Sequence, residues 1–258
     1  MKEIENKELG KVIVKKNNRL IYATDKVVTK VFDHNFYTPS DVLKEAMNQA
    51  YALELGFNVP KLLKVFPVGE EYAISSERIS GQTLKEKMDS DPKNVKKYIE
   101  TLVKIQKTLL DKISDNLKLP KLKDKLNNYI SHSGLDASTR YDLHVRLESM
   151  PNHYKVCHGD LTPHNIIFEG ETPYILDWAH ATRGNASADA SITYLLFLLE
   201  GEDKLADLYI KSFAKHFDIP LQYIQHWVSV VSATKLATTK DEKKRELLLR
   251  NINVVDAF

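Results

Sequence analysis

The segment from His158 to Asn165 constrains this chain more than any other, and it reads His-Gly-Asp-Leu-Thr-Pro-His-Asn. Twelve residues after Asn165 comes Asp177, which follows the apolar pair Ile-Leu. The stretch between them predicts a short hairpin around Gly170, which would bring Asn165 and Asp177 close together. Mg²⁺ prefers hard oxygen ligands of this kind, and phosphoryl transfer also needs a carboxylate that orients a hydroxyl nucleophile. The spacing therefore predicts Asn165 and Asp177 as metal ligands and Asp160 as the catalytic base.

The order of these residues resembles the catalytic loop and the metal-binding Asp of the protein-kinase-like phosphotransferases. Gly159 stands where protein kinases carry Arg, and this form resembles the aminoglycoside phosphotransferase and choline kinase branch. The resemblance implies a bilobal α+β fold, in which a small antiparallel sheet with one helix precedes a larger, mainly helical lobe. It also implies a kinase that uses ATP, with GTP as the alternative, together with Mg²⁺, and that phosphorylates a hydroxyl group of a small molecule.

The apolar pattern of the first eighty residues predicts strands and one helix. The helix is expected from Ser40 or Asp41, either of which can cap it, to about Leu55, with Gly56 as its stop signal. Five β-branched or alternating runs predict strands, which cover 11–15, 19–23, 27–32, 60–66 and 71–77.

After Gly81 the apolar residues recur at helical spacing. A short strand at 155–158 would lead into the catalytic loop. We therefore expect a nucleotide-binding domain over residues 1–80, and a helical domain with the catalytic loop and the metal site over residues 81–258. The expected helices cover 83–88, 94–113, 121–131, 138–149, 187–200, 202–216, 220–236 and 240–256.

The resemblance also implies a lysine that grips the nucleotide phosphates and a glutamate that pairs with it. Lys30, on the third expected strand, and Glu45, in the expected helix, match these positions, and Glu45 precedes Pro60 by the family's spacing of fifteen residues. Lys26 and Glu54 are the rivals, at a strand entry and a helix end. Mid-strand and mid-helix positions make a buried pair possible, which favours Lys30 and Glu45.

Adenine is read by backbone groups in the family, at the segment that joins the lobes. By position, the carbonyl group of Glu77 and the amide group of Ile79 would contact it here. A Gly-rich phosphate loop is missing, because residues 15–19 read Lys-Lys-Asn-Asn-Arg. Turn amides or the nearby cations would have to take over its role.

Several residues around the catalytic loop are expected to support it. In the family, the residues that match His158 and Asp189 brace the loop and tie a helix to it. Cys157 is expected to fill the core as a small apolar group. His164 and His180 flank the site, but we do not expect them to bind a metal, because no Cys or second His lies at zinc-like spacing.

Composition argues against several other classes of protein. Cys157 is the only Cys, so the chain cannot form an internal disulfide. The net charge of +2 is too small to indicate nucleic-acid binding. The charged start has no apolar run like that of a signal peptide, and no stretch reaches the roughly 18 apolar residues of a membrane span. We expect a cytoplasmic enzyme without a nucleic-acid, membrane or obligate protein partner.

The acceptor stays open among an aminoglycoside, a choline-like compound, a sugar and an amino alcohol. Residues 83–130 hold 12 Lys against 7 Asp and Glu, which disfavours a polycation, since binding one calls for acidic loops. Some relatives, however, end in a tail whose terminal carboxylate faces the substrate, and Phe258 is similar to that end.

Two alternative functions remain. A protein Ser/Thr kinase is disfavoured by Gly159, which replaces the loop Arg, and by the short segment after Asp177. A catalytically silent nucleotide-binding pseudokinase would act through protein contacts. Degraded site residues would indicate it, and Asp160, Asn165 and Asp177 are all intact.

Overall fold

The computed structural model describes residues 8–16, 18–114 and 118–253. Phe258 and the expected end of the last helix lie outside this described part. The chain forms two compact units, and neither is continuous in sequence. The first unit comprises residues 1–87 with 163–180, and the second comprises residues 88–162 with 181–258.

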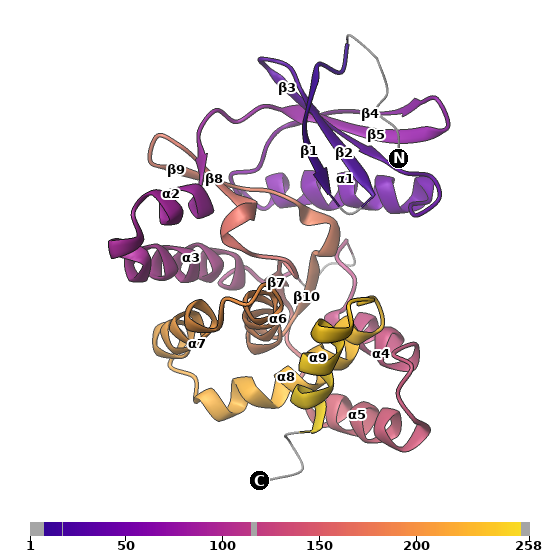
Figure 1. Ribbon diagram of the computed structural model, residues 1–258, viewed down its shortest axis with the longest axis vertical. Helices are drawn as coiled ribbons and strands as arrows, with labels where there is room; N and C mark the ends of the chain where they lie inside the picture. The colour runs from indigo at the N-terminus through magenta and orange to yellow at the C-terminus, as the bar shows by residue number, and fades with distance from the viewer. Residues whose placement is uncertain (1–7, 17, 115–117, 254–258) are drawn as a thin grey trace. The chain divides into compact units, whose positions relative to one another are not determined.

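The first unit is built on a five-stranded antiparallel sheet with the order β1-β2-β3-β5-β4 (Figure 1). The edge strand β4 starts later than expected and continues through Pro67, which an edge strand tolerates because one side of its backbone needs no partner. All five expected strands are present, as β1 (Lys11–Lys16), β2 (Arg19–Ala23), β3 (Val27–Phe32), β4 (Leu62–Val68) and β5 (Glu71–Glu77).

The helix α1 (Pro39–Glu54) begins earlier than expected, and neither Ser40 nor Asp41 is its cap. Thr38 is the cap: its hydroxyl accepts from the Asp41 amide at 3.3 Å, and the Asp41 carboxylate accepts from the Thr38 amide at 2.9 Å. Asp41 is thus the third helical residue of a capping box. Pro39 occupies the first helical position, where a missing N–H costs nothing.

Apolar side chains cover both faces of the sheet. Val42 and Ala46 of α1 pack with Phe32 and Ile74 of the strands. Neighbouring residues such as Val31 point to the opposite face, because side chains alternate along a strand. That face carries a second cluster, which consists of Leu9, Leu20, Tyr22, Val31, Val68 and Ala73.

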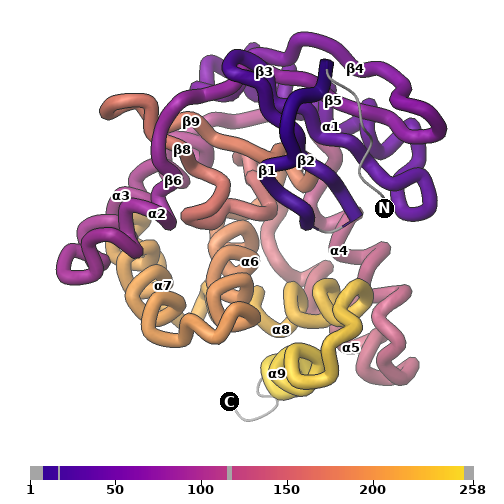
Figure 2. The backbone as a smooth tube through the Cα atoms, turned by 45° about the horizontal axis from the view of Figure 1, so that its top comes forward, coloured from indigo at the N-terminus to yellow at the C-terminus, as the bar shows by residue number. Residues whose placement is uncertain are grey.

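A smaller sheet of the order β6-β8-β9 completes the first unit (Figure 2). It comprises β6 (Gln82–Thr83), β8 (Ile166–Glu169) and β9 (Thr172–Ile175), and β8 and β9 form the expected hairpin around Gly170. Gly81 lies against this sheet so closely that an added Cβ would be 1.8 Å from the carbonyl oxygen of Phe168. No side chain fits there without movement of the backbone.

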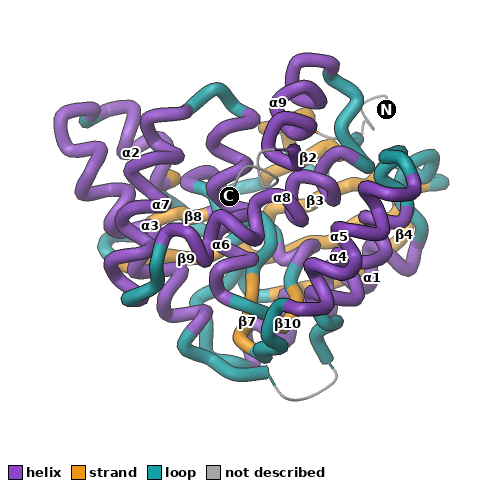
Figure 3. The backbone as a smooth tube through the Cα atoms, turned by 90° about the horizontal axis from the view of Figure 1, so that it is seen from below, coloured by secondary structure: helices purple, strands orange, loops and turns teal. Residues whose placement is uncertain are grey.

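The second unit is mainly helical, as expected, and contains one pair of short strands (Figure 3). The strand β7 (Lys155–Cys157) pairs antiparallel with β10 (Thr182–Gly184). β10 was not expected, because Thr-Arg-Gly carries no strand pattern. The helices are α2 (Leu84–Ser90), which begins in the first unit, α3 (Val95–Leu110), α4 (Leu122–Ser131), α5 (Ala137–Ser149), α6 (Ala186–Leu199), α7 (Asp203–Phe217), α8 (Leu221–Leu236) and α9 (Glu242–Asn253). A short 3₁₀ turn covers Pro92–Asn94 in this unit, and two others, Pro163–Asn165 and Trp178–His180, belong to the first unit.

The helix α6 is the centre of the second unit. Ten of its residues are buried, as is typical of a helix that neighbours surround. It packs against α7 and α8, and α7 in turn packs against α3. Among the described residues, no helix combines the length and apolar character that crossing a membrane requires.

Replacing Gly81 by Ala should destabilise the first unit. The new Cβ would force β6 away from the Phe168 carbonyl group, and overpacking of this kind costs about 1–3 kcal/mol. Urea denaturation followed by circular dichroism measures the change. The neighbouring exposed Ser80 provides the control, since Ser80→Ala should shift the midpoint little; equal effects of the two variants would contradict the close contact.

Candidate functional site

The first unit brings Lys30 and Glu45 together as a partly buried ion pair. Lys30 lies in the middle of β3, and its Nζ is 2.7 Å from Oε1 of Glu45 on α1. Glu45 is only 4% exposed. The rivals Lys26 and Glu54 are both exposed. The sheet and the helix that covers it therefore place the two residues that the sequence favoured in direct contact.

Asp177 joins this pair. Its Oδ1 is 3.2 Å from Nζ of Lys30, so the ammonium group lies between two carboxylates. Burial by itself would lower the pKa of Lys30, but the negative charges of Glu45 and Asp177 outweigh burial and raise that pKa above its usual value. Lys30 is therefore a fixed cation at neutral pH.

Arg19 is a second cation of this cluster, and the sequence reasoning had not singled it out. Its Nη1 is 3.5 Å from Oδ1 of Asp177 and 3.6 Å from Oε2 of Glu45. Its guanidinium carbon lies 5.9 Å and 5.8 Å from the ring centroids of Phe32 and Tyr37. In the sequence, its position directly after the first turn was the feature that could have indicated this role. In the structure, Arg19 pairs with Phe32 of β3.

The β8–β9 hairpin places Asn165 and Asp177 at the same end of the first unit. Asn165 immediately precedes β8, and its carbonyl oxygen accepts from the Leu176 amide at 2.8 Å. Asp177 follows with a φ of 63°, a left-handed conformation that is uncommon for residues other than Gly and frequent at functional sites. The hydrogen bond between Asn165 and Leu176 thus places the backbone segments of the two proposed metal ligands side by side.

Trp178 anchors the backbone next to Asp177. Its indole is 1% exposed, stacks on Phe57 with a centroid distance of 5.7 Å, and donates to the Ile175 carbonyl group at 3.0 Å. Asn48 of α1 donates to the carbonyl group of Trp178 at 3.0 Å. Asn48 follows Glu45 by three residues, so one face of α1 positions both the carboxylate that holds Lys30 and the backbone that carries Asp177. Sequence reasoning did not find Asn48.

The donor set suits a hard divalent cation. Asn165 offers an amide oxygen and Asp177 a carboxylate, which are ligands that Mg²⁺ prefers. Among the described residues, one group of His, Cys, Asp and Glu has its ligand atoms within 4.8 Å of one another: Asp33, His34 and Glu71. Neither His164 nor His180 belongs to it.

Asp160 belongs to the second unit, where a buried polar network fixes its loop. The amide of Asp160 donates to Nδ1 of the fully buried His158 at 3.3 Å. The amide of Gly159, at a φ of 75°, donates to Oδ1 of Asp189 at 2.8 Å. From α6, the hydroxyl group of Thr193 donates to the Leu161 carbonyl group at 3.0 Å.

Asp189 is itself held by residues that the sequence reasoning missed. Gln106 of α3 donates to its Oδ2 at 2.9 Å, and the Tyr209 hydroxyl group of α7 donates to the Gln106 side-chain oxygen at 2.6 Å. Burial raises the pKa of Asp189, and the hydrogen bonds from Gln106 and Gly159 oppose this rise. Three helices therefore support the loop through one carboxylate.

Lys235 of α8 is the charged neighbour of Asp160. Burial lowers the pKa of Lys235, and the negative charge of Asp160 partly opposes this shift. Lys235 therefore lies within electrostatic reach of the proposed catalytic base. It was also missed from the sequence, where it lies seventy-five residues away from Asp160.

The two residues expected to contact adenine, Glu77 and Ile79, lie at the end of β5 and just past it. Glu77 is the last residue of that strand; its amide donates to the Lys61 carbonyl group and its Oε1 accepts from the Lys61 amide, both at 2.9 Å. Ile79 lies past the strand and is partly buried. Both residues belong to the first unit, together with the Lys30 cluster.

A family model described as a phosphotransferase enzyme family matches residues 14–220 of the chain. A search of curated protein sequences found no match.

Solved structures of phosphotransferases have the same fold. A thermostable mutant of the aminoglycoside phosphotransferase APH(4)-Ia is 10% identical with a TM-score of 0.69, covering 95% of this chain and 92% of that chain. The amicoumacin kinase hAmiN, in complex with AMP-PNP, Ca²⁺ and Ami, is 12% identical with a TM-score of 0.64, at 97% and 89% coverage. A choline/ethanolamine kinase family protein from Mesorhizobium loti is 14% identical with a TM-score of 0.62, at 95% and 87% coverage. At these identities the likeness shows the fold alone.

Replacing Asp189 by Asn should loosen the loop that carries Asp160. An amide nitrogen would then face either the Gly159 or the Gln106 donor, and an unsatisfied buried group costs about 1–3 kcal/mol. Thermal denaturation should show the loss, and hydrogen exchange should show faster exchange at Gly159. Asp207→Asn, at an exposed position of α7, is the control; unchanged exchange at Gly159 in Asp189→Asn would refute the bracing role.

Proposed function

The chain belongs to the phosphotransferase enzyme family, and we propose that it transfers the γ-phosphoryl group of magnesium-bound ATP to a hydroxyl group of a small molecule. The observation that carries this proposal is the cluster of Lys30, Glu45 and Asp177, with an ammonium group 2.7 Å and 3.2 Å from two carboxylates. A cation fixed beside a hard-metal ligand is the arrangement that phosphate binding requires. ATP as the donor fits the cytoplasmic location expected from the sequence.

Each residue of the first unit has a role in this proposal. Lys30 contacts the nucleotide phosphates, and Glu45 keeps it in position. Asn165 and Asp177 hold Mg²⁺, which when bound neutralises phosphate charge. The backbone of Glu77 and Ile79 contacts the base, and GTP remains the alternative because backbone contacts alone do not define which base is preferred.

Arg19 takes the role of the missing Gly-rich loop. It lies at the start of β2, directly after the first turn, and contacts the same carboxylates as Lys30. A guanidinium group forms paired hydrogen bonds with phosphate oxygens. We assign it to the phosphates, which Lys30 and Arg19 would hold from two strands of one sheet.

Asp160 orients the acceptor hydroxyl group and accepts its proton. Transfer requires that this carboxylate of the second unit meets the phosphate held by the first. Positioning supplies much of the rate in phosphoryl transfer. The bracing of the loop by Asp189 would contribute to it by limiting the movement of the Asp160 carboxylate.

The charge of the helical part of the chain bears on the acceptor. The lysine-rich segment that follows Thr83 would repel an approaching polycation. We therefore favour a neutral hydroxyl compound, such as a sugar, over an aminoglycoside, a choline-like compound or an amino alcohol, all of which are cationic at neutral pH. Similar solved structures were determined with hygromycin B and with amicoumacin, which describes those proteins.

Replacing Asp160 by Asn should reduce turnover by about 10²–10⁴-fold, the usual contribution of a general base. The measurement is magnesium-dependent ATP consumption over a panel of sugars, amino alcohols, choline and aminoglycosides. Nucleotide affinity should stay unchanged, and the exposed Asp111→Asn should behave as wild type. A wild-type protein that binds ATP but is inactive on every acceptor would instead favour the silent nucleotide-binding module, and activity on a Ser or Thr peptide alone would favour a protein kinase.

Replacing Lys30 by Ala should weaken ATP binding at least about tenfold, since it removes a charge-assisted contact with phosphate and leaves two carboxylates facing the nucleotide. Isothermal titration with a non-hydrolysable ATP analogue and Mg²⁺ measures the change. Lys26→Ala is a matched control, because Lys26 is the exposed rival just before the same strand. A larger loss in Lys26→Ala would reverse the assignment.

A further inference from the structure

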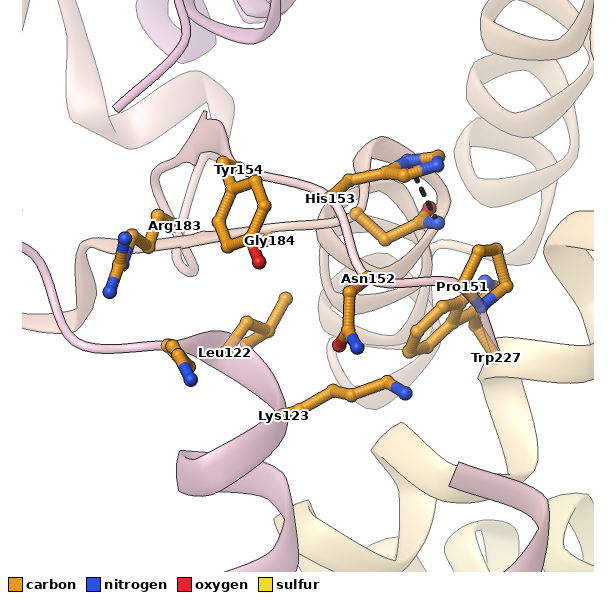
Figure 4. A pocket seen from close by; sticks show the side chains of 11 residues that line it. Leu122, Lys123, Pro151, Asn152, His153, Tyr154, Arg183, Gly184 and Trp227 are labelled. Atoms are coloured by element: carbon orange, nitrogen blue, oxygen red, sulfur yellow. Dashed lines mark hydrogen bonds between the residues drawn. The ribbon is translucent and has the colours of Figure 1, made fainter. Parts of the chain in front are cut away.

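A pocket of about 50 Å³ lies in the second unit, and none of the residues that line it is assigned to catalysis (Figure 4). It is formed where β7 begins and β10 ends. Since Gly184 pairs with Lys155, whereas Thr182 pairs with Cys157 next to the catalytic loop, the pocket is at the opposite end of this strand pair from His158. Its walls are Lys121, Leu122, Lys123, Pro151, Asn152, His153, Tyr154, Arg183, Gly184, Asn185 and Trp227.

The Lys and Arg residues that line this pocket give it a positive charge. Lys121, Lys123 and Arg183 line it, and its described lining contains no Asp or Glu. The nearest acid along the helix, Asp124, is exposed and does not line the pocket. Figure 4 shows Lys123 extending along one side of the pocket, below Asn152.

The start of α4 adds backbone donors to these cations. Lys121 is the residue before the first turn, and no side chain among the described residues caps it there. The first amide groups of a helix have no partner within the helix, and its dipole is positive at this end. Lys121, Leu122 and Lys123, which line the pocket, are the residues at this end, so the pocket combines two features that favour an anion.

Trp227 provides an independent sign that an acceptor belongs here. It is 1% exposed, and its buried Nε1 has no hydrogen-bond partner among the described residues. A buried donor without an acceptor is rare, because it loses its bond with water and gains none. An anion in the pocket would supply the missing acceptor in a wall that already carries positive charge.

The walls are held in place before any ligand binds. An added Cβ on Gly184 would be 2.5 Å from Cβ of Leu122, so glycine is what allows α4 to start directly against β10. The Arg183 amide donates to the Pro120 carbonyl group at 2.9 Å, and its guanidinium carbon is 5.4 Å from the Tyr154 ring centroid. His153 and the Asn185 side chain are hydrogen-bonded at 3.2 Å, as the dashed line in Figure 4 marks.

We infer that this pocket binds a small tetrahedral oxyanion: inorganic phosphate or the phosphoryl group of a small phosphate monoester. A volume of about 50 Å³ exceeds the roughly 10–15 Å³ that a single water requires, so the pocket has room for a group of the size of phosphate. Trp227 would donate one hydrogen bond, the helix start would donate others, and Lys121 and Lys123 would balance the charge.

The two tryptophans make the test direct. In protein labelled with ¹⁵N-tryptophan, Trp178 and Trp227 give separate indole signals, which Trp227→Phe assigns. Titration with inorganic phosphate, in the presence of saturating AMP-PNP and Mg²⁺, should shift the Trp227 signal in a saturable way. The Trp178 signal should stay unchanged, because its N–H already donates to Ile175 and it lies beside the proposed nucleotide site.

Variants of α4 locate the binding site. The double variant Lys121→Ala with Lys123→Ala should weaken the apparent affinity at least about tenfold, since it removes two charge-assisted contacts. Lys125→Ala, on the same helix but outside the pocket lining, should bind as wild type. Indole signals of all variants at the wild-type positions show that the fold is kept.

The ligands distinguish the two sources of the anion. Stronger binding of glycerol phosphate than of inorganic phosphate would assign the pocket to a phosphate monoester, and the reverse would assign it to the free ion. The inference is overturned if neither ligand moves the Trp227 signal, or if the double variant binds both as tightly as wild type.

Discussion

Lys30 and Glu45 form an ion pair at a partly buried position of the first unit, where the buried carboxylate alone would be unfavourable. Such a pair is often no more stabilising than apolar residues of the same volume, so stability does not explain it. The pair fixes an ammonium group 3.2 Å from Asp177. The packing of α1 on the sheet positions both groups, because this helix carries Glu45 and also holds the Trp178 carbonyl group, next to Asp177, through Asn48.

The second unit uses the opposite arrangement, a single buried carboxylate surrounded by neutral donors. Asp189 accepts from Gly159 and from Gln106, and Gln106 accepts from Tyr209. Each group in this series is satisfied by the next, which makes the network rigid. The loop with Asp160 is therefore positioned by three helices that are distant in sequence, which hold it through its backbone amide and carbonyl groups.

Secondary structure that depends on local sequence pattern was predicted, whereas residues whose contacts lie far away in the sequence were not. The five strands follow from β-branched runs, and the hairpin follows from the apolar residues around Gly170. Arg19, Gln106 and Lys235 carry no such pattern, because their neighbours lie up to 158 residues away, as Arg19 and Asp177 do. Ser40 or Asp41 was the expected cap, because both residue types favour that position, but Thr38 with Pro39 after it is the cap in the structure.

The left-handed backbone of Asp177 has a consequence for how this chain can change. Asn and Gly adopt a φ of 63° at least as readily as Asp does, and each is one nucleotide change from an Asp codon. Either substitution would leave the turn and the Trp178 anchor intact while it removes the charge of the proposed metal ligand. Most other side chains would strain the turn. A mutation at this position can therefore turn the enzyme into a folded, inactive protein at little cost in stability. Only selection for activity would preserve the carboxylate.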